Sequence, residues 1–455
     1  MTQQQYDFVV AGGGPAGSVT AIALANRGAR VAVLEAHAKP VERFAGEWFH
    51  PTGVAVLERL GIEVPGAAQD IPRGRGFVVF PNDLSTPIIL PYPDGGRASA
   101  CEHSTIVATL WNAAASHRNI DFIPQARVSG IENNGRRIHY QHGKKKQNKA
   151  IDCDFVVGAV GRSSKIAADF GCRESGSLVS YMAGIELNGI ELPFEGYGHI
   201  IGGKPAPMLM YRFAPDRVRL CVDLPAHLGH LRRDKMQVWQ MLSGHLPEEI
   251  APAVKDAFEN QKITWTNVQF RPKGYYGHAR IALVGDTVGH FHPLTAGGLT
   301  MGFVDAECLA QSKDLGRYRK TRIAQTYVPE LLSNALYQVF IRNDDSARAI
   351  RKTVLDAWRH HPKEPARTMR ILIGANTNGL NFAETFFELG LRAALPEISR
   401  SIRSGSLADT AGIVIDFAKW MRWPLASAVP SRVRGYYRHR SDGQTPFWGS
   451  RTSEA

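Results

Sequence analysis

A glycine-rich stretch near the N-terminus, Tyr6-Asp-Phe-Val-Val-Ala-Gly-Gly-Gly-Pro-Ala-Gly17, decides the expected fold of this chain. Its apolar half reads as a short buried strand. Gly12 then permits a tight turn, Gly14 lets the backbone approach a pyrophosphate, and Gly17 lets the following helix pack closely on the strand. A second apolar run leads to Glu35, whose carboxylate can accept ribose hydroxyl groups. Strand, helix and acid in this order predict a dinucleotide-binding βαβ unit.

A second glycine-rich stretch stands far downstream. Residues 281–284 read as a strand, Gly285 closes a turn that exposes Asp286, and a loop from His292 to Gly298 leads into a helix. A carboxylate at this turn can hold ribityl hydroxyl groups, and open N–H groups at a helix N-terminus can stabilise negative charge on a reduced flavin. The two stretches together predict FAD, bound along its length by two distant segments of chain.

Length and composition are those of a globular protein with two or three domains: 455 residues, of which 44% are hydrophobic. We expect no secretory leader and no membrane-spanning helix, because the chain shows neither a leader pattern nor 18 consecutive apolar residues. The five cysteines are scattered without Cys-x-x-Cys spacing. A cytoplasmic location, no disulfide framework and no metal site are therefore expected.

The chain is basic, with a formal net charge of +12. Such an excess can attract an acidic membrane surface or an acidic partner protein. The run Lys144–Lys146 is expected in a solvated hairpin turn. The stretch Arg432–Arg440 interleaves arginine with tyrosine, but no nucleic-acid-binding motif accompanies it. We therefore expect a basic C-terminal tail and no nucleic-acid partner.

The order of apolar runs predicts an α/β protein with three parts. A discontinuous Rossmann-like FAD-binding domain is expected over residues 1–175 and 276–330. A β-sheet substrate-binding domain is inserted over residues 176–275. A helical C-terminal region with the basic tail follows over residues 331–455.

Four further segments resemble one family. The chain looks like a group A flavin-dependent monooxygenase and, within that class, is most similar to the squalene monooxygenases. The resemblance is carried by the segment Gly46–Gly61, which matches the family's GE…P.G…L..LG pattern, by the strands His199–Tyr211 and Arg219–Pro225, and by the loop His-Pro-Leu-Thr-Ala-Gly-Gly-Leu-Thr at His292–Thr300. It covers most of residues 5–310.

The resemblance implies a reaction and a set of site residues. NAD(P)H or a separate reductase would reduce FAD, and O2 would form a flavin C4a-hydroperoxide that hydroxylates or epoxidises an apolar isoprenoid or aromatic substrate. Four residues of the downstream loop would act at the reacting end of the flavin: His292, Pro293, Gly297 and Gly298. The residues expected to bind the cofactor are Gly12, Gly14, Pro15, Ala16, Gly17, Glu35, Arg43, Glu47, Gly161, Gly285, Asp286, Pro293, Gly297 and Gly298.

Two positions depart from the family pattern. Val160 stands where relatives carry the aspartate of an Asp-Gly motif, so direct reduction by NAD(P)H stays an open question. The arginine that relatives carry near residue 103 is absent, and its role could pass to Arg43 or to His103.

The substrate pocket is expected against the β-rich middle of the chain. Met208, Met210 and Tyr211 are the candidates to line it, although strand alternation places the two methionines on one face and Tyr211 on the other. Two other functions remain open. The chain could be a flavin reductase of prenyl chains, or an accessory flavoprotein that modifies a partner polypeptide.

Overall fold

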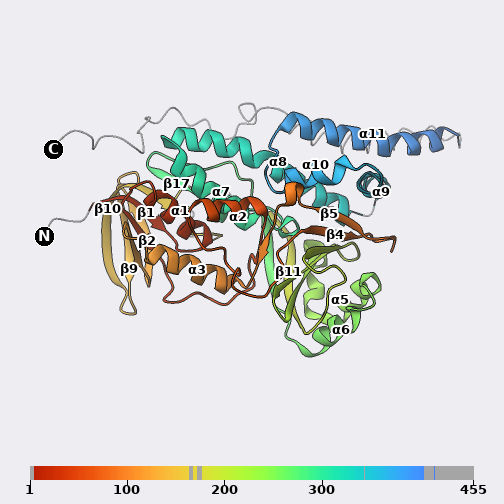
Figure 1. The fold of residues 1–455 in the computed structure, drawn as a ribbon, viewed down its shortest axis with the longest axis horizontal. Helices are drawn as coiled ribbons and strands as arrows, with labels where there is room; N and C mark the ends of the chain where they lie inside the picture. The colour runs from red at the N-terminus through yellow and green to blue at the C-terminus, as the bar shows by residue number, and fades with distance from the viewer. Residues whose placement is uncertain are drawn as a thin grey trace.

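The computed structural model describes residues 5–162, 166, 168–171, 177–342, 344–403 and 415. The expected basic stretch at 432–440 lies outside these residues. Figure 1 shows two sheets side by side with a helical layer along one edge of both. The predicted fold class is confirmed: an α/β nucleotide-binding part, a second sheet and a helical C-terminal region.

The first sheet has the parallel core that the N-terminal stretch predicts. Its main path runs in the order β16-β17-β10-β1-β2-β7, parallel except for the edge strand β16. The antiparallel strands β8 and β9 extend it through β10. The bounds are β1 Tyr6–Ala11, β2 Val31–Leu34, β7 Ile120–Ile123, β8 Ala126–Glu132, β9 Arg137–His142, β10 Gln147–Gly158, β16 Gly277–His278 and β17 Ile281–Leu283.

Helices cover this sheet because packing removes the apolar surfaces of both helices and strands from water. Helix α1 packs against α3 and α7, and α2 packs on α7. Strand β1 and helix α1 are almost wholly buried, which accounts for the continuous apolar run in the sequence. The bounds are α1 Pro15–Ala25, α2 Pro51–Arg59, α3 His103–Ala115 and α7 Gly298–Gln311.

The second sheet has seven strands in the order β15-β11-β14-β13-β12-β4-β5. Two of them, β4 and β5, come from residues 76–91, inside the range expected for the nucleotide-binding domain; the domain boundaries stay a prediction. The bounds are β4 Gly76–Phe80, β5 Ile88–Pro91, β11 Ser177–Asn188, β12 Tyr197–Ile201, β13 Met208–Ala214, β14 Arg217–Pro225 and β15 Trp265–Phe270; a separate ribbon pairs β3 Trp48–Phe49 with β6 Ser99–Ala100.

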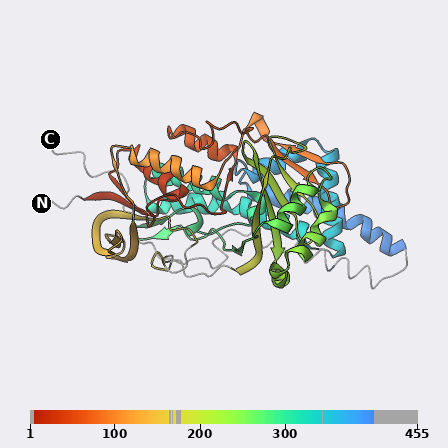
Figure 2. The ribbon, with the colours of Figure 1, turned by 90° about the horizontal axis from the view of Figure 1, so that it is seen from below.

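Both faces of the second sheet are covered. Figures 1 and 2 show α5 and α6 on one face and the C-terminal helices on the other. No helix among the described residues is long and apolar enough to cross a membrane. The bounds are α5 Lys235–Leu242, α6 Ala251–Asn260, α8 Leu315–Ile341, α9 Asp345–His360, α10 Lys363–Leu372 and α11 Gly379–Arg403, with short 3₁₀ turns η1 Pro93–Gly95, η2 Ala226–Arg233, η3 Ser243–His245, η4 Gly285–Thr287 and η5 Pro293–Thr295.

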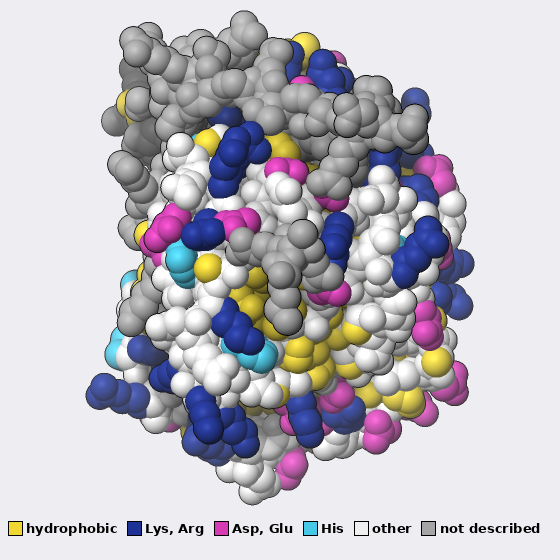
Figure 3. Space-filling view, turned by 90° about the vertical axis from the view of Figure 1, so that its left-hand side faces the viewer, with side chains coloured by type: hydrophobic (Ala, Val, Ile, Leu, Met, Phe, Trp, Pro, Cys, Tyr) yellow, Lys and Arg dark blue, Asp and Glu magenta, His cyan; other side chains and the backbone are white. Residues whose placement is uncertain are grey.

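The basic charge is spread out at the end of the molecule that carries β9 and β10. Figure 3 shows lysine and arginine side chains on this face with acidic ones between them. The run 144–146 lies in the exposed turn between β9 and β10, as expected. Dispersed charge of this kind is typical of a solvated surface.

Candidate functional site

The N-terminal turn has the backbone geometry that its glycines predict. Gly12 has a φ of +106°, and a Cβ there would lie 2.4 Å from the Ala159 carbonyl oxygen. A Cβ on Gly17 would lie 1.9 Å from the Gly12 carbonyl oxygen, so the helix could not approach the turn with any larger residue. A Cβ on Gly14 would meet nothing within 4 Å. Gly14 therefore presents open backbone at the N-terminus of α1, where Pro15 is the first helical residue.

Glu35 lies at the carboxyl end of β2 and is almost buried. One carboxylate oxygen accepts the Gly13 N–H at 2.8 Å and the other accepts the His37 N–H at 2.7 Å. The indole N–H of Trp111, from α3, donates to the Gly13 carbonyl at 2.5 Å. The His37 ring Nδ1 also lies 2.8 Å from the second Glu35 oxygen. Glu35 thus orients the turn, and the oxygen that accepts from Gly13 retains accepting capacity for a ribose hydroxyl.

The two distant stretches meet at Ala16. A Cβ on Gly285 would lie 2.7 Å from the Ala16 side chain, and Gly285 itself has a φ of +63°. The Gly161 N–H donates to the Thr287 hydroxyl at 2.9 Å, which ties the end of β10 to η4. The predicted contributions from the first motif, from Gly161 and from the Gly285 turn therefore lie together at one edge of the first sheet.

Asp286 projects from this turn beside cationic groups. Its carboxylate accepts from Arg162 Nε at 3.0 Å. Burial raises the pKa of Asp286, but the charges of Arg162 and Lys273 outweigh that effect and hold the pKa below its usual value. Asp286 is therefore an anion, suited to accept hydroxyl groups.

The loop before α7 is held by the side chain of His292. Its Nδ1 accepts the Leu294 N–H at 3.3 Å, so Nε2 carries the proton. Nε2 lies 3.3 Å from Ser180 Oγ and 3.5 Å from Asp223 Oδ1, and the ring stacks on Tyr337 with centroids 3.9 Å apart. Both ring nitrogens face protein partners. The expectation of a catalytic His292 therefore gains no support, and the geometry is that of a positioning residue.

The two glycines at the end of this loop have free space around their Cα atoms. A Cβ on Gly297 would meet only side-chain atoms at 3.8 Å, and one on Gly298 would meet only Asp286 Oδ1, at 3.9 Å. No side chain caps the N-terminus of α7. Pro293 begins η5, directly before these residues. The backbone N–H groups at the start of α7 can therefore serve a ligand that also touches Asp286.

Glu47 was expected to bind the cofactor, but protein groups take both of its oxygens. Arg219 donates to Oε1 at 2.8 Å and to Oε2 at 3.0 Å, and the Tyr211 hydroxyl donates to Oε2 at 3.0 Å. Burial raises the pKa of this carboxyl, while the Arg219 charge opposes the shift. Glu47 joins the segment after β2 to the second sheet, and a direct contact with cofactor gains no support.

Arg43 and His103, the two residues that could take the role of the arginine found in relatives, differ in their surroundings. His103 is buried and its Nδ1 lies 2.9 Å from the Gly46 carbonyl oxygen; burial lowers its pKa. Arg43 is exposed. Cofactor binding by Arg43 stays a prediction. Val160, the other position that departs from the family pattern, is partly buried against the core of the first sheet.

The three expected substrate-lining residues divide between two faces. Met208 and Met210 are fully buried on the face that α5 and α6 cover, among core residues such as Leu242 and Phe258. Tyr211 lies on the opposite face, with Trp48 and the C-terminal helices. The substrate role of the two methionines therefore gains no support, and only Tyr211 remains a proposal.

The buried residues that support the loop before α7 were not predicted from the sequence. His50 is fully buried, with Nε2 at 2.8 Å from the Thr295 carbonyl oxygen and Nδ1 at 2.7 Å from the Tyr92 hydroxyl. Burial lowers its pKa to about 4, so the ring is neutral and links the loop to β3. Asp223 and Tyr337 hold His292 in the same way. No spacing signal could have found them, because their partners are remote in sequence.

The residues present fit FAD. Open backbone at Gly14 suits a diphosphate, Glu35 suits a ribose, Asp286 suits the ribityl chain, and the start of α7 suits the flavin. Among the described residues, no group of histidine, cysteine, aspartate or glutamate side chains could hold a metal ion.

Comparison with known proteins gives matches in sequence and in fold. The family model described as squalene epoxidase matches residues 153–406, more than half of the chain, and the NAD(P)-binding Rossmann-like domain model matches residues 10–52. Squalene monooxygenase of Rattus norvegicus is 25% identical over 370 residues, which cover 76% of this chain and 64% of that protein. Squalene epoxidase 3 of Arabidopsis thaliana is 26% identical, over 91% of this chain and 84% of that one.

Solved structures share the fold at lower identity. The p-nitrophenol 4-monooxygenase PnpA from Pseudomonas putida DLL-E4 superposes with a TM-score of 0.67 at 17% identity, over 82% of this chain and 100% of that one. The flavin-dependent brominase Bmp2 gives a TM-score of 0.64 at 16% identity, over 85% of this chain and 99% of that one. At these identities the likeness shows the fold alone.

Proposed function

From the premise that this chain belongs to the squalene epoxidase family, we propose that it is an FAD-dependent monooxygenase acting on an apolar isoprenoid or aromatic substrate. One observation carries the proposal most directly. The Gly12–Gly17 turn and the Gly285–Asp286 turn meet at Ala16 and together suit one long cofactor. Bound FAD would supply the redox chemistry that places one oxygen atom of O2 in the substrate and the other in water, with two electrons from NAD(P)H.

The protein's own part is binding, orientation and exclusion of water. His292 and His50 each brace the loop before α7 through buried hydrogen bonds. A fixed loop keeps the N–H groups at the start of α7 aimed at one position, where they can stabilise developing negative charge. The two histidines are themselves buried, so their hydrogen bonds to the loop are shielded from water.

An apolar cavity among the C-terminal helices is our candidate for the substrate's hydrocarbon. Leu336, Val354, Trp358 and Phe386 are among its lining residues, from α8, α9 and α11. Helix α8 also carries Tyr337, which stacks on His292. One helix therefore connects the cavity with the loop beside the expected flavin.

Labelling with 18O2 tests the monooxygenase function. The purified protein, loaded with FAD, is incubated with NADPH or dithionite and a panel of prenyl, aromatic and partner-peptide substrates. We expect label in an apolar small molecule. Saturation of a prenyl double bond without label would identify the flavin reductase, and label in a peptide alone would identify the accessory function.

A cavity-filling variant tests the substrate site. Ala357 lines the cavity, so Ala357→Phe should raise KM at least fivefold with little change in FAD affinity. Ala25→Val, in the buried end of α1, is a control for general overpacking. Equal KM values for Ala357→Phe and the unaltered protein would remove the cavity from the proposal.

We also propose that α11 rests on a membrane surface. Five of its large apolar residues are exposed at helical spacing along one side: Leu380, Phe387, Leu391, Leu395 and Ile402. Such a stripe, with Arg392 and Arg403 on the same helix, suits an anionic lipid interface. Leu391→Glu with Leu395→Glu should abolish co-sedimentation with vesicles containing phosphatidylserine. Unchanged sedimentation would contradict the proposal, and retention of only an acidic protein would favour that partner instead.

A further inference from the structure

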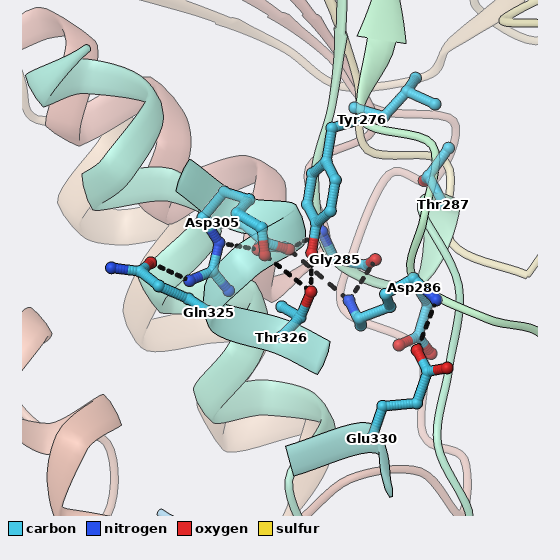
Figure 4. Close-up of polar contacts among 12 residues, drawn as sticks. Tyr276, Gly285, Asp286, Thr287, Asp305, Gln325, Thr326 and Glu330 are labelled. Carbon is cyan, nitrogen blue, oxygen red and sulfur yellow. Dashed lines mark hydrogen bonds and ion pairs between the residues drawn. The ribbon is translucent and has the colours of Figure 1, made fainter. Parts of the chain in front are cut away.

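The two peptide groups that meet at Gly285 are each held by a buried charged side chain. Its N–H donates to Asp305 Oδ2 at 2.9 Å, and its carbonyl accepts from Lys273 Nζ at 2.9 Å. Figure 4 shows these contacts converging on Gly285 from α7 and from the segment before β16. This clamp therefore fixes two successive peptide planes, Val284–Gly285 and Gly285–Asp286, on either side of the Gly285 Cα atom. The direction in which Asp286 leaves the turn is then fixed as well.

The clamp is itself a buried ion network. Lys273 Nζ lies 3.6 Å from Asp305 Oδ2, and Arg322 Nε donates to Asp305 Oδ1 at 2.7 Å. The exposed fractions of these side chains are 0% for Lys273, 0% for Asp305 and 1% for Arg322. Charges so deeply buried lose their hydration, and apolar residues of similar volume often give equal or greater stability. Stability alone is therefore a weak reason for such a network.

The rest of the turn is held in the same manner. Arg271 Nη2 donates to the carbonyl oxygens of Asp286 at 2.7 Å and of Thr287 at 2.8 Å. Three successive carbonyl groups, from Gly285 to Thr287, thus accept from buried cations behind the turn. Glu330 accepts the backbone N–H of Lys273 at 2.8 Å and anchors the segment that carries both cations. The Asp286 carboxylate itself accepts from Arg162.

We propose that Lys273 and Asp305, with Arg322 behind them, are positioning residues for the FAD site. They set the two peptide planes that flank Gly285 so that Asp286 meets the ribityl hydroxyl groups without rearrangement on binding. The inference rests on the proposed function, because the turn needs this precision only if it receives FAD. It assigns a cofactor-binding role to buried residues that do not touch the cofactor.

Replacement of the network by apolar residues separates positioning from stability. The triple variant Lys273→Met, Asp305→Leu, Arg322→Met removes every charge of the clamp at similar volume. The Gly285 N–H and carbonyl lose their partners, which costs stability for each group that finds no other, so we expect the apoprotein to stay folded with a lower urea midpoint. FAD affinity, measured by quenching of flavin fluorescence, should fall at least tenfold and by more than the loss of stability accounts for. The single variants Lys273→Met and Lys273→Arg serve if the triple variant does not fold. Of these, Lys273→Arg should retain most of the affinity because it retains a donor to the Gly285 carbonyl.

The matched control is Glu307→Gln on the same helix. Glu307 pairs with Arg59 at 2.7 Å, but at the surface and away from the Gly285 turn. FAD affinity of this variant should change less than twofold. Clamp variants that fold and bind FAD as tightly as the unaltered protein would overturn the inference, and so would affinity that falls only in proportion to apoprotein stability. Failure of the unaltered protein to bind FAD would instead overturn the proposed function.

Discussion

At the scale of the residue, buried partners decide what each side chain can do. His292 stands in the motif that points to the flavin, yet one ring nitrogen accepts from Leu294 and the other faces Asp223 and Ser180. Asp223 in turn accepts from the Ser180 hydroxyl at 2.5 Å and from the Tyr337 hydroxyl at 3.2 Å. The ring is therefore a structural link between the second sheet, α8 and the loop.

Removal of Asp223 should loosen that loop. Asp223→Ala removes the carboxylate that faces His292 and leaves the hydroxyl groups of Ser180 and Tyr337 without their acceptor, at a cost of about 1–3 kcal/mol for each buried group that finds no other partner. We expect amide hydrogen exchange over residues 293–298 to rise at least tenfold. Tyr337→Phe, which keeps the ring stacked on His292, should show a smaller rise. Exchange that does not change in Asp223→Ala would show that the loop holds itself.

Glu330 should make stability depend on pH. Burial raises the pKa of its carboxyl to about 7 from the ordinary value of 4.5. The folded state then binds the proton more tightly than the unfolded state, so this group stabilises the fold below pH 4.5 and loses that contribution as pH rises to about 7. The shift corresponds to at most about 3 kcal/mol. In urea unfolding of the apoprotein between pH 5 and 8, Glu330→Gln should show a smaller fall in stability than the unaltered protein, and parallel curves would refute this origin.

At the scale of the element, the turn between β1 and α1 serves two purposes with different glycines. Gly12 and Gly17 make room for the protein's own backbone, as the close approaches to Ala159 and to Gly12 show. A Cβ atom at Gly14 would contact no other part of the protein, so the absence of a side chain there leaves space for a ligand. A stability requirement and a binding requirement are therefore separated by three residues of sequence.

Two single substitutions should separate these requirements. Gly17→Ala forces the helix away from the turn and should destabilise the apoprotein by about 3 kcal/mol or more. Gly14→Ala should leave the urea midpoint of the apoprotein unchanged, because its Cβ enters open space, but should weaken FAD binding at least tenfold. If Gly14→Ala lowered the urea midpoint and the FAD affinity as much as Gly17→Ala does, the role of Gly14 would be structural.

At the scale of the whole molecule, the expected cofactor joins segments that are remote in sequence. The first contains Gly14 and Glu35, and the second contains Asp286 and the start of α7. A ligand that needs both can bind only the folded chain, so it must stabilise the fold by linkage. No histidine or cysteine lies in a recognisable flavin-attachment motif, so FAD is expected to be held without a covalent bond.

The purified protein should therefore be yellow and should release FAD on heating or in acid. At free FAD 100-fold above Kd, the free energy of unfolding should rise by about 2.7 kcal/mol. Asp286→Ala removes charge-assisted hydrogen bonds of about 1.5–3 kcal/mol and should weaken FAD retention tenfold or more. A colourless protein that takes up no added FAD, with an unfolding curve that FAD does not move, would contradict the cofactor assignment.

The sequence alone was sufficient to predict the dinucleotide-binding unit, the second sheet and the helical region. Turn glycines act through their own backbone, and apolar periodicity acts within one element, so both signals are local. The same locality explains why Gly12, Gly17, Gly285 and the N-terminus of α7 have the predicted geometry. The FAD assignment followed from two such local signals occurring together.

Tertiary structure decided which side chains complete the site. Strands β4 and β5 belong to the second sheet, because pairing between strands depends on partners that spacing does not reveal. Glu47 pairs with Arg219, and His292 lies beside Asp223, because folding brings together elements that are remote in sequence. The clamp of Lys273 and Asp305 on Gly285 has no sequence pattern at all. A buried charge must be paired in space, and its partner can come from any element that reaches it.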